Sequence, residues 1–299
     1  MTSPCFMLKS VRWLDSDCQL CRSSPLNALK LTSLVNVNFF GQFGFAVFPV
    51  ICTKCGLTYL SRRWDDSTYD KFYNYVYDSF YRIDNFPEIG TSGVTSRYEE
   101  IGHHIAKFLD FRPSRIVDIG GGSGLGALTL AKMFNISEVD VIEAGKLRLT
   151  HSEIPSNITI SYYPSLTLLP LKVNTLFVSR HTIEHFLHLH DDISFIREAM
   201  HSSDLLFAST PDALDIRRDL RDYSDSFEYF FRVPHVVYYN EFTLRSALSV
   251  NRLSVIDLSS VSHELRVLAK ATDLSCVLDQ PYLASKVQSQ ISHYRHVGT

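Results

Sequence analysis

Residues 115–126 read Arg-Ile-Val-Asp-Ile-Gly-Gly-Gly-Ser-Gly-Leu-Gly. The first five residues predict a short strand, and residues 124–134 are apolar at helical spacing. The glycines between them allow the backbone to turn sharply and to approach a ligand closely. Free N–H groups at the start of the following helix can bind a polar ligand group. The stretch therefore predicts a strand, a ligand-binding turn and a helix.

Strands and helices alternate on both sides of this turn. A loop is predicted at 91–96 and helices near 97–110 and at 190–201. Further strands are predicted at 138–142, 157–162, 175–179 and 204–209. Such alternation is typical of a parallel sheet with helices on both faces, so we expect an α/β, Rossmann-like fold.

The last part of the alternating region predicts an antiparallel edge. A helix at 241–250 is preceded by Asn240, a residue type that caps helices. Two β runs, 252–259 and 264–270, follow with a short polar connection between them. They predict a hairpin at the edge of the sheet.

Composition limits the class of protein. The 299 residues are 45% hydrophobic and 20% charged, which favours a folded core. The 29 basic and 32 acidic side chains give a net charge of -3, which argues against a broad nucleic-acid-binding surface. No signal peptide is recognisable, and the longest apolar stretch, around 43–51, is far shorter than the ~20 residues that span a bilayer. We expect a cytoplasmic protein without a membrane segment.

Four of the six cysteines form two close pairs, Cys18-x2-Cys21 and Cys52-x2-Cys55. Two such pairs can supply the four thiolates of a tetrahedral zinc site. Because four thiolates leave no coordination position for water, the predicted zinc is structural. Unrelated buried cysteines are the alternative, and a redox pair is disfavoured because neither pair opens a helix after a strand.

Two cofactor classes use a glycine-rich turn of this kind. Gly122-x-Gly124-x-x-Ala127 fits the dinucleotide pattern. Asp118, Gly120, Gly122 and Gly124 instead fit the turn expected for S-adenosylmethionine. Asp118 favours S-adenosylmethionine, since a carboxylate attracts its cationic amino-acid end but repels a pyrophosphate. Glu143, at the end of the second strand, can accept hydrogen bonds from ribose hydroxyls in either cofactor.

A cluster of histidines follows the strand at 175–179. It reads Ser179-Arg-His-Thr-Ile-Glu-His185, and it lies at the sheet edge where ligands of open α/β folds bind. A histidine there can take a proton near neutral pH, and the adjacent Glu184 could orient it. His181 and His185 also have metal-ligand spacing on a helix, and simple packing of these histidines is a further alternative.

With these motifs, the chain resembles the class I S-adenosylmethionine-dependent methyltransferases. More narrowly, it resembles the zinc-containing C-methyltransferases of nucleotide-linked deoxysugars, over about residues 15–270. The similar motifs are the two cysteine pairs, Tyr75-x-Tyr77-x-Ser79, Val117-Asp-Ile-Gly-Gly-Gly-Ser-Gly124, Arg180-His-Thr-Ile-Glu-His185, and Pro234-His235 with Tyr239 and Leu244. The resemblance is to a shortened form, because longer members carry a second C-terminal α/β domain.

The resemblance implies a seven-stranded methyltransferase sheet with a small N-terminal zinc-binding module. The implied divisions are a zinc module at 1–62, an aromatic linker or lid at 63–96, the methyltransferase domain at 97–275 with a lid or insertion at 211–239, and a C-terminal tail or helix at 276–299.

The resemblance also implies roles for individual residues. His185, next to Glu184, is the candidate base, while Tyr77 and His181 are further catalytic candidates. Ser79 and Ser179 join the candidate cofactor-binding residues.

We therefore expect methyl transfer from S-adenosylmethionine to a small polar acceptor, and the favoured acceptor is a carbon of a modified, nucleotide-linked sugar. O- or N-methylation of another metabolite or of RNA is one alternative. An NAD-dependent oxidoreductase and a non-catalytic zinc-bearing scaffold are the others.

Overall fold

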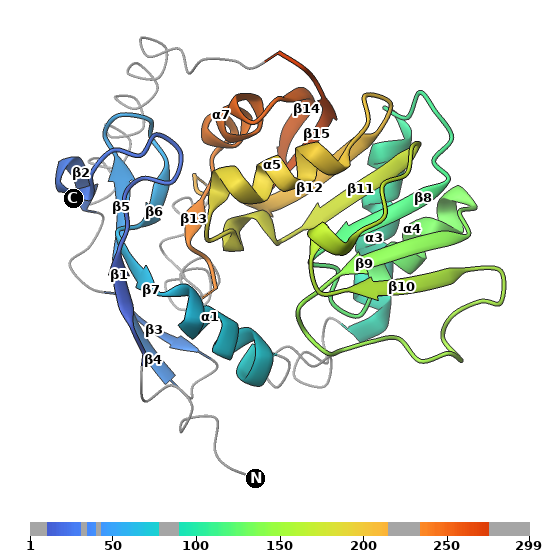
Figure 1. The fold of residues 1–299 in the computed structure, drawn as a ribbon, viewed down its shortest axis with the longest axis horizontal. Coiled ribbons are helices and arrows are strands. Elements are labelled where there is room, and N and C mark those ends of the chain that lie inside the picture. Colours follow the sequence, from blue (N-terminus) through green and yellow to red (C-terminus); the bar gives the residue numbers. More distant parts are fainter. Residues whose placement is uncertain (1–10, 31–34, 40–42, 78–89, 215–233, 275–299) are drawn as a thin grey trace.

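The computed structural model describes residues 11–30, 35–39, 43–77, 90–214 and 234–274. Figure 1 shows a large sheet flanked by helices and a smaller β part made mainly of strands from the N-terminal region. The large sheet has seven strands in the order β10-β9-β8-β11-β12-β15-β14. Their bounds are β8 Arg115–Ile119, β9 Glu138–Ile142, β10 Thr159–Tyr163, β11 Thr175–Arg180, β12 Leu205–Pro211, β14 Leu253–Val261 and β15 Glu264–Ala271.

The sheet is mixed. The pairs from β10 to β12 are parallel, whereas β15 runs antiparallel to both β12 and β14. The expected α/β class and the hairpin at the sheet edge are therefore confirmed. Because Asp118 of β8 lies opposite Val178 of β11, the ends of these two strands lie side by side. The glycine-rich turn and the histidine cluster consequently leave the sheet at the same edge.

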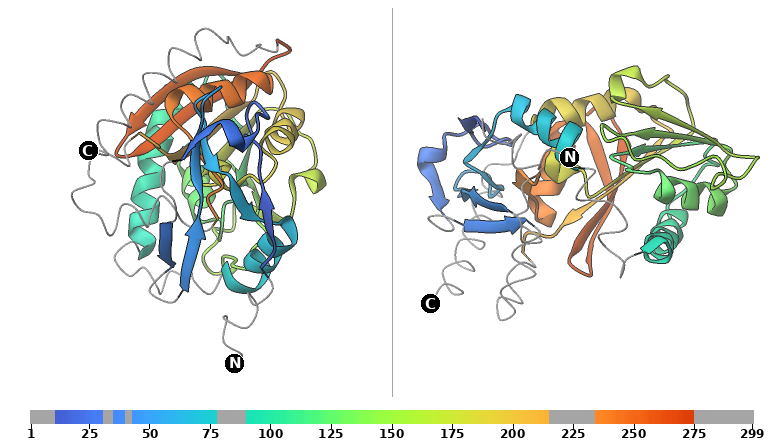
Figure 2. Two further views of the ribbon diagram at one scale, coloured as in Figure 1. Left: turned by 90° about the vertical axis from the view of Figure 1, so that its left-hand side faces the viewer. Right: turned by 90° about the horizontal axis from the view of Figure 1, so that it is seen from below.

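Helices cover both faces of the sheet (Figure 2). On one face lie α3 (Gly90–Ala106) and α4 (Leu125–Phe134), and on the other α5 (Leu189–Ala199) and α7 (Glu241–Val250). Neighbouring side chains of β8 serve different cores: Ile116 packs with α3 and α4, and Val117 with the opposite face. This alternation follows from the two-residue period of a strand.

Helix ends differ in how well the sequence predicts them. The helix at 241–250 is confirmed, and Asn240 Oδ1 accepts a hydrogen bond from Thr243 N at 2.9 Å. The loop predicted at 91–96 is wrong, because α3 begins at Gly90. Gly, Ser and Thr are weak helix formers, but Val94 and Tyr98 pack against the core. These tertiary contacts outweigh the local preference.

Tyr98 lies directly on Gly126, where α3 crosses α4. A Cβ atom at position 126 would overlap the Tyr98 ring, which is buried. We expect Gly126→Ala to lower the free energy of unfolding by about 1–3 kcal/mol, as overpacking does in other cores. Urea denaturation measures this. Gly102→Ala is the comparison variant, because its Cβ would meet the flexible end of Met133 and, at 3.1 Å, a methyl group of Leu130, but no aromatic ring. Equal losses in the two variants would contradict the prediction.

The smaller part contains a four-stranded sheet of order β13-β6-β5-β2. Its strands are β2 Ala28–Lys30, β5 Pro49–Cys52, β6 Thr58–Leu60 and β13 Val237–Tyr238. Two further pairs are β1 (Trp13–Asp15) with β7 (Arg62–Trp64), and β3 (Val35–Phe39) with β4 (Phe43–Val47). Helix α1, Asp66–Phe72, and a short π-helical turn, Tyr73–Tyr77, follow β7. Because β13 comes from the C-terminal half of the chain, it joins the cysteine part to the large sheet.

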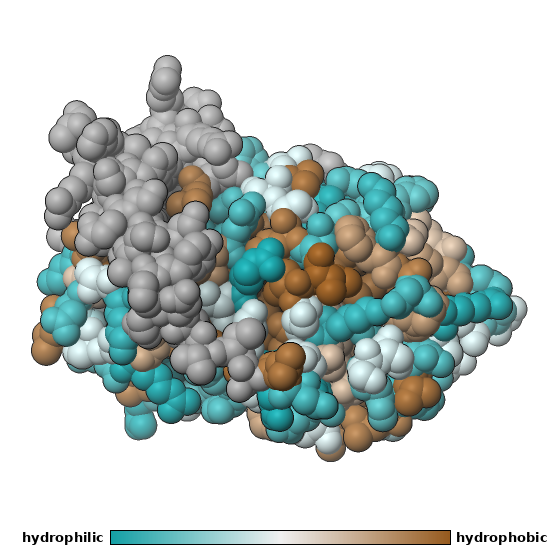
Figure 3. Space-filling model, turned by 90° about the horizontal axis from the view of Figure 1, so that it is seen from above, coloured by the Kyte–Doolittle hydropathy of each residue, from teal (hydrophilic) through white to brown (hydrophobic). Residues whose placement is uncertain are grey.

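The surface seen from above mixes hydrophilic and apolar side chains (Figure 3). None of the helices in the described residues combines the length and the apolar character that crossing a membrane requires.

Candidate functional site

The glycine-rich turn has the backbone shape that only glycine adopts easily. Gly120 and Gly122 have φ values of +70° and +55°, in the left-handed region. A Cβ atom on Gly120 would overlap Thr182, so the turn packs closely against the segment after β11. Among the residues that the structure describes, none has a heavy atom within 4 Å of a Cβ atom on Gly122. The turn therefore faces open space at Gly122, where a ligand could approach the backbone.

Asp118 ends β8 just before this turn. Its side chain is 1% exposed, and neither carboxylate oxygen makes a hydrogen bond of normal geometry with the described residues. Burial, and then the charge of Glu143, raise the pKa of Asp118 to about 7. Ser179 Oγ, at the neighbouring strand end, is also buried without a hydrogen bond. Buried polar groups without partners are costly, and at a strand end they mark a ligand site.

Glu143 and Tyr162 enclose the other side of the turn. Glu143 Oε2 accepts a hydrogen bond from Gly122 N at 3.0 Å. Tyr162 Oη donates to Ser123 O at 2.7 Å, and Arg148 lies over the Tyr162 ring at 4.4 Å. The structure thus brings Glu143 to the turn, as its position at a strand end predicts. Tyr162 is an additional site residue, and its signal in the sequence is its place near the end of β10.

Glu184 is the centre of a charged cluster after β11. It lies in a 3-10 turn, Ile183–His185, and is 1% exposed. His181 Nδ1 lies 3.4 Å and His235 Nε2 4.0 Å from Glu184 Oε1. Burial opposes ionisation of Glu184, but His181, His185 and His235 lower its pKa to about 2. Glu184 is therefore a buried carboxylate held in its charged form by three histidines.

His185 contacts the π-helical turn Tyr73–Tyr77. Tyr73 Oη lies 3.1 Å from His185 Nδ1, and Tyr77 packs on Tyr73 with ring centroids 5.1 Å apart. The His235 ring lies 5.0 Å from that of His185, at an angle of 34°. Tyr77 thus approaches His185 through Tyr73, whereas Ser79 lies outside the described residues. Tyr73 has no motif of its own in the sequence, because its contact with His185 joins positions 112 residues apart.

The four cysteines of the smaller part come together. Cys18 Sγ lies 3.4 Å from Cys55 Sγ, and Cys21 Sγ 3.5 Å from Cys52 Sγ. All four sulfurs lie within 4.8 Å of one another, and the cysteines are free. Zinc–sulfur bonds of about 2.3 Å in a tetrahedron require sulfur atoms about 3.8 Å apart. The cluster therefore has the composition and nearly the size of a four-thiolate zinc site.

The neighbouring thiols also shift one another's ionisation. Contact with Cys21 raises the pKa of Cys18, and contact with Cys18 lowers the pKa of Cys52. Four thiols in contact cannot all ionise without a cation to compensate their charge. The cluster consequently fits a metal ion better than it fits four independent thiols.

The cysteine part contacts the candidate active site through its backbone. Leu60 N donates to Val236 O at 3.0 Å, and Val236 N donates to Glu184 O at 2.9 Å. His190 Nε2 donates to Leu20 O, between the first two cysteines, at 3.0 Å. These bonds connect the segment that carries Glu184 to β6, and the start of α5 to the first cysteine pair.

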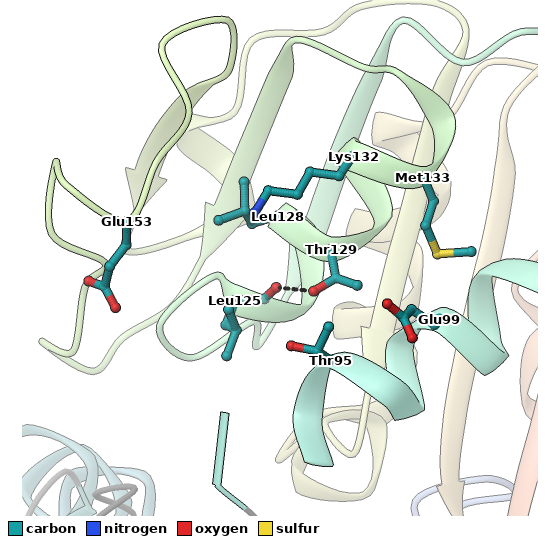
Figure 4. A pocket seen from close by; sticks show the side chains of 8 residues that line it. All are labelled: Thr95, Glu99, Leu125, Leu128, Thr129, Lys132, Met133 and Glu153. Carbon is teal, nitrogen blue, oxygen red and sulfur yellow. Dashed lines mark hydrogen bonds between the residues drawn. The ribbon is translucent and has the colours of Figure 1, made fainter. Parts of the chain in front are cut away.

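A groove of about 350 Å³ lies elsewhere, between α3 and α4 (Figure 4). Thr95 and Glu99 of α3 face Lys132 and Met133 of α4 across it. Its lining includes neither Asp118 nor any residue of the histidine cluster, so the candidate chemistry lies outside this groove.

Several solved structures are similar in fold at low identity. One chain of the Haloferax volcanii complex between the Trm112 methyltransferase activator and a methyltransferase is 11% identical, with a TM-score of 0.48 and coverage of 61% of this chain and 93% of that chain. The magnesium protoporphyrin IX methyltransferase (ChlM) of Synechocystis PCC 6803 with bound SAH is 13% identical, with a TM-score of 0.43 and coverage of 60% of this chain and 84% of that chain. Human N-acetylserotonin methyltransferase in complex with SAM is 12% identical, with a TM-score of 0.45 and coverage of 61% of this chain and 55% of that chain.

The family assignment rests on a different comparison. No curated protein matches the chain significantly. A family model described as a methyltransferase domain matches residues 94–257, which is more than half of the chain. The matched region begins in α3 and ends in β14, so it contains the glycine-rich turn and the histidine cluster. The chain therefore belongs to the methyltransferase-domain family.

Proposed function

We propose that the protein transfers a methyl group from S-adenosylmethionine to a small polar acceptor. The observation that carries this proposal is the buried Asp118 carboxylate, whose oxygens have no hydrogen bond of normal geometry within the described residues, next to the open backbone of Gly122. An ionised carboxylate there can pair with the cationic amino-acid end of the cofactor. Glu143 is close enough to the turn to bind the ribose hydroxyls. When bound, S-adenosylmethionine supplies an electrophilic methyl group.

His185 is the proposed base. It would take a proton from the acceptor, and the nearby Glu184 carboxylate would stabilise the resulting imidazolium. Tyr73 orients its ring through Nδ1, and Tyr77 is the proposed second substrate-binding group. A base at this position suits an acceptor carbon next to a keto group, whose proton must leave before methylation. We therefore favour C-methylation of a modified, nucleotide-linked sugar over O- or N-methylation.

The cysteine module, proposed to span residues 1–62, would bind one structural zinc ion. Cys18, Cys21, Cys52 and Cys55 supply four thiolates, which leaves no coordination position for water or substrate. The proposed role of the metal is to hold the two cysteine pairs together, and through β6 and β13 to support the segment around Glu184.

Calorimetry tests the cofactor. We expect S-adenosylmethionine and S-adenosylhomocysteine to bind the full chain and NAD to give no heat. Gly122→Ala should weaken binding of S-adenosylmethionine at least about tenfold, which corresponds to about 1.4 kcal/mol, because its methyl group enters the open space of the turn. Gly102→Ala, on the outer helix α3, is the control and should bind normally. Binding of NAD without S-adenosylmethionine would overturn the proposal.

The acceptor is then sought by mass spectrometry. Nucleotide sugars that carry a keto group are incubated with the protein and S-adenosylmethionine, and a gain of one methylene unit identifies the product. Methylation of RNA, or of a hydroxyl acceptor alone, would contradict the favoured acceptor while leaving methyl transfer in place.

A further inference from the structure

His181 lies between two buried carboxylates. Its Nδ1 atom is 3.4 Å from Glu184 Oε1, and its Nε2 atom is 3.1 Å from Glu264 Oε1. Glu184 is 1% exposed and Glu264 5%. A neutral imidazole has one N–H donor, so its other nitrogen would direct a lone pair at a carboxylate. Only the imidazolium form has two N–H donors and therefore suits both partners.

Glu264 is the first residue of β15, and side chains of β12 and β15 hold its carboxylate in place. Ser209 Oγ donates to Glu264 Oε1 at 2.6 Å, and Arg266 Nε donates to Oε2 at 3.3 Å. Arg180 Nε lies 3.4 Å from the same carboxylate. Burial opposes ionisation, but His181 and then Arg180 keep the pKa of Glu264 well below its ordinary value. Glu264 is thus a fixed anion that His181 can bind.

The backbone of His181 also indicates a fixed role. Its φ of +51° lies in the left-handed region, which costs a residue with a side chain roughly 1–2 kcal/mol. His181 N donates to Ser209 O at 2.9 Å, and this bond ties the turn to β12. Unusual backbone conformations persist where surrounding contacts determine them, often next to a functional site. Here the contacts are those to Ser209, Glu184 and Glu264.

We propose that His181 is a positioning residue, an imidazolium paired with two buried carboxylates that holds Glu184 next to His185, and that it does not act as the second base. This inference rests on the proposed function for the role of His185. Its physical content is separate: a buried carboxylate oxygen lies within 3.4 Å of each ring nitrogen, which favours the imidazolium, and an imidazolium has no lone pair to accept a substrate proton. His185 differs in its partner, because its Nδ1 atom contacts the Tyr73 hydroxyl at 3.1 Å.

The charges around His181 come from three elements. Arg180 and Glu184 flank it on its own segment, Glu264 and Arg266 lie on β15, and Glu100 of α3 pairs with Arg266 at 2.7 Å. Burial and Arg180 disfavour the protonated form, whereas Glu184 and Glu264 favour it, and the net effect raises the pKa of His181. Because the two carboxylates act directly on the two nitrogens, they are the groups to remove in a test.

Nitrogen-15 NMR of histidine-labelled full chain tests this inference without any acceptor. His181→Gln assigns the His181 signals, and His151, which is exposed, gives a reference titration assigned by His151→Gln. We expect both His181 nitrogens to carry protons at neutral pH, and to lose the first of these protons at a higher pH than His151 does. Glu264→Gln should lower the midpoint of the His181 titration by about one pH unit or more, since an opposite charge in contact is removed.

The outcomes separate this inference from the proposed function. A single N–H on His181 at pH 7, or a titration that coincides with that of His151, would overturn the positioning role. An unchanged titration in Glu264→Gln would overturn it as well. Calorimetry with S-adenosylmethionine on the same samples reports on the proposed function independently. Normal cofactor binding together with a neutral His181 would therefore refute the inference alone.

Discussion

S-adenosylmethionine is expected to bind about tenfold more tightly at pH 8 than at pH 6. Burial, and then the charge of Glu143, raise the pKa of Asp118 to about 7. The ionised fraction of this carboxyl group therefore rises from about one-tenth to about nine-tenths over that range. Only the ionised form attracts the cationic end of the cofactor, so the affinity should follow this fraction. Calorimetry at pH 6, 7, 8 and 9 measures it directly.

The same titration predicts that protons are released on binding. At pH 7 about half of the Asp118 carboxyl groups are protonated, and cofactor binding should release roughly half a proton per chain. Calorimetry in two buffers with different ionisation enthalpies detects this release. At pH 9 the release should approach zero, because Asp118 is then ionised before binding.

Two variants sharpen the test. Asp118→Asn should bind S-adenosylmethionine at least about tenfold more weakly at pH 8 and lose the pH dependence between 6 and 8. Glu143→Gln should keep a pH dependence but move it to lower pH, because the second cause of the raised Asp118 pKa is removed. A wild-type pH profile in Asp118→Asn would show that another group governs binding.

In the ligand-free protein, the contribution of Asp118 to the free energy of unfolding should decrease as the pH rises, whereas cofactor affinity increases. The pKa of Asp118 is raised in the folded state, whereas an unfolded aspartate has a pKa of about 3.9. Between about pH 4 and pH 7 the folded state thus holds the extra proton. Its contribution to the free energy of unfolding is largest below this range and is lost as the pH rises to about 7.

The sequence predicts the central sheet well because each strand carries its own signal. The run at 115–119 is bounded by Pro113 and by glycines, and β8 has these bounds in the structure. Asn240 likewise fixes the start of α7 through a local hydrogen bond to Thr243. The start of α3 depends instead on contacts with distant residues, such as that of Tyr98 with Gly126. A local signal could not reveal it.

In the candidate site, too, some residues are predictable from local sequence patterns, whereas contacts between distant positions are not. The four cysteines follow from short spacing, and Asp118 and Glu143 follow from their places at strand ends. The ion pair between His181 and Glu264 joins β11 to β15, and the strand pair β13–β6 joins Val237 to Tyr59. Pairings between such distant positions depend on how the chain packs. No local pattern in the sequence encodes them.

Loss of the metal from the cysteine cluster is expected to destabilise the protein strongly. We expect one zinc ion per chain and none in Cys52→Ser, because three thiolates and a hydroxyl bind zinc far more weakly than four thiolates. Structural zinc contributes several kcal/mol or more, so the melting temperature should fall by about 10 °C or more. Metal analysis and thermal unfolding measure the two effects. Cys5→Ser and Cys276→Ser, outside the two pairs, are the controls and should retain the zinc.

Chelation should affect methyl transfer far more than cofactor binding. The backbone bonds from Leu60 to Val236 and from Val236 to Glu184 connect the cysteine module with the segment that carries Glu184. Asp118 and Gly122 lie instead on β8 and its turn, within the large sheet. If the module loosens without zinc, Glu184 and His235 lose their support while the cofactor turn keeps its own. We therefore expect chelated protein to bind S-adenosylmethionine almost normally but to lose most of its turnover, and a parallel loss of both would show that zinc supports the whole fold.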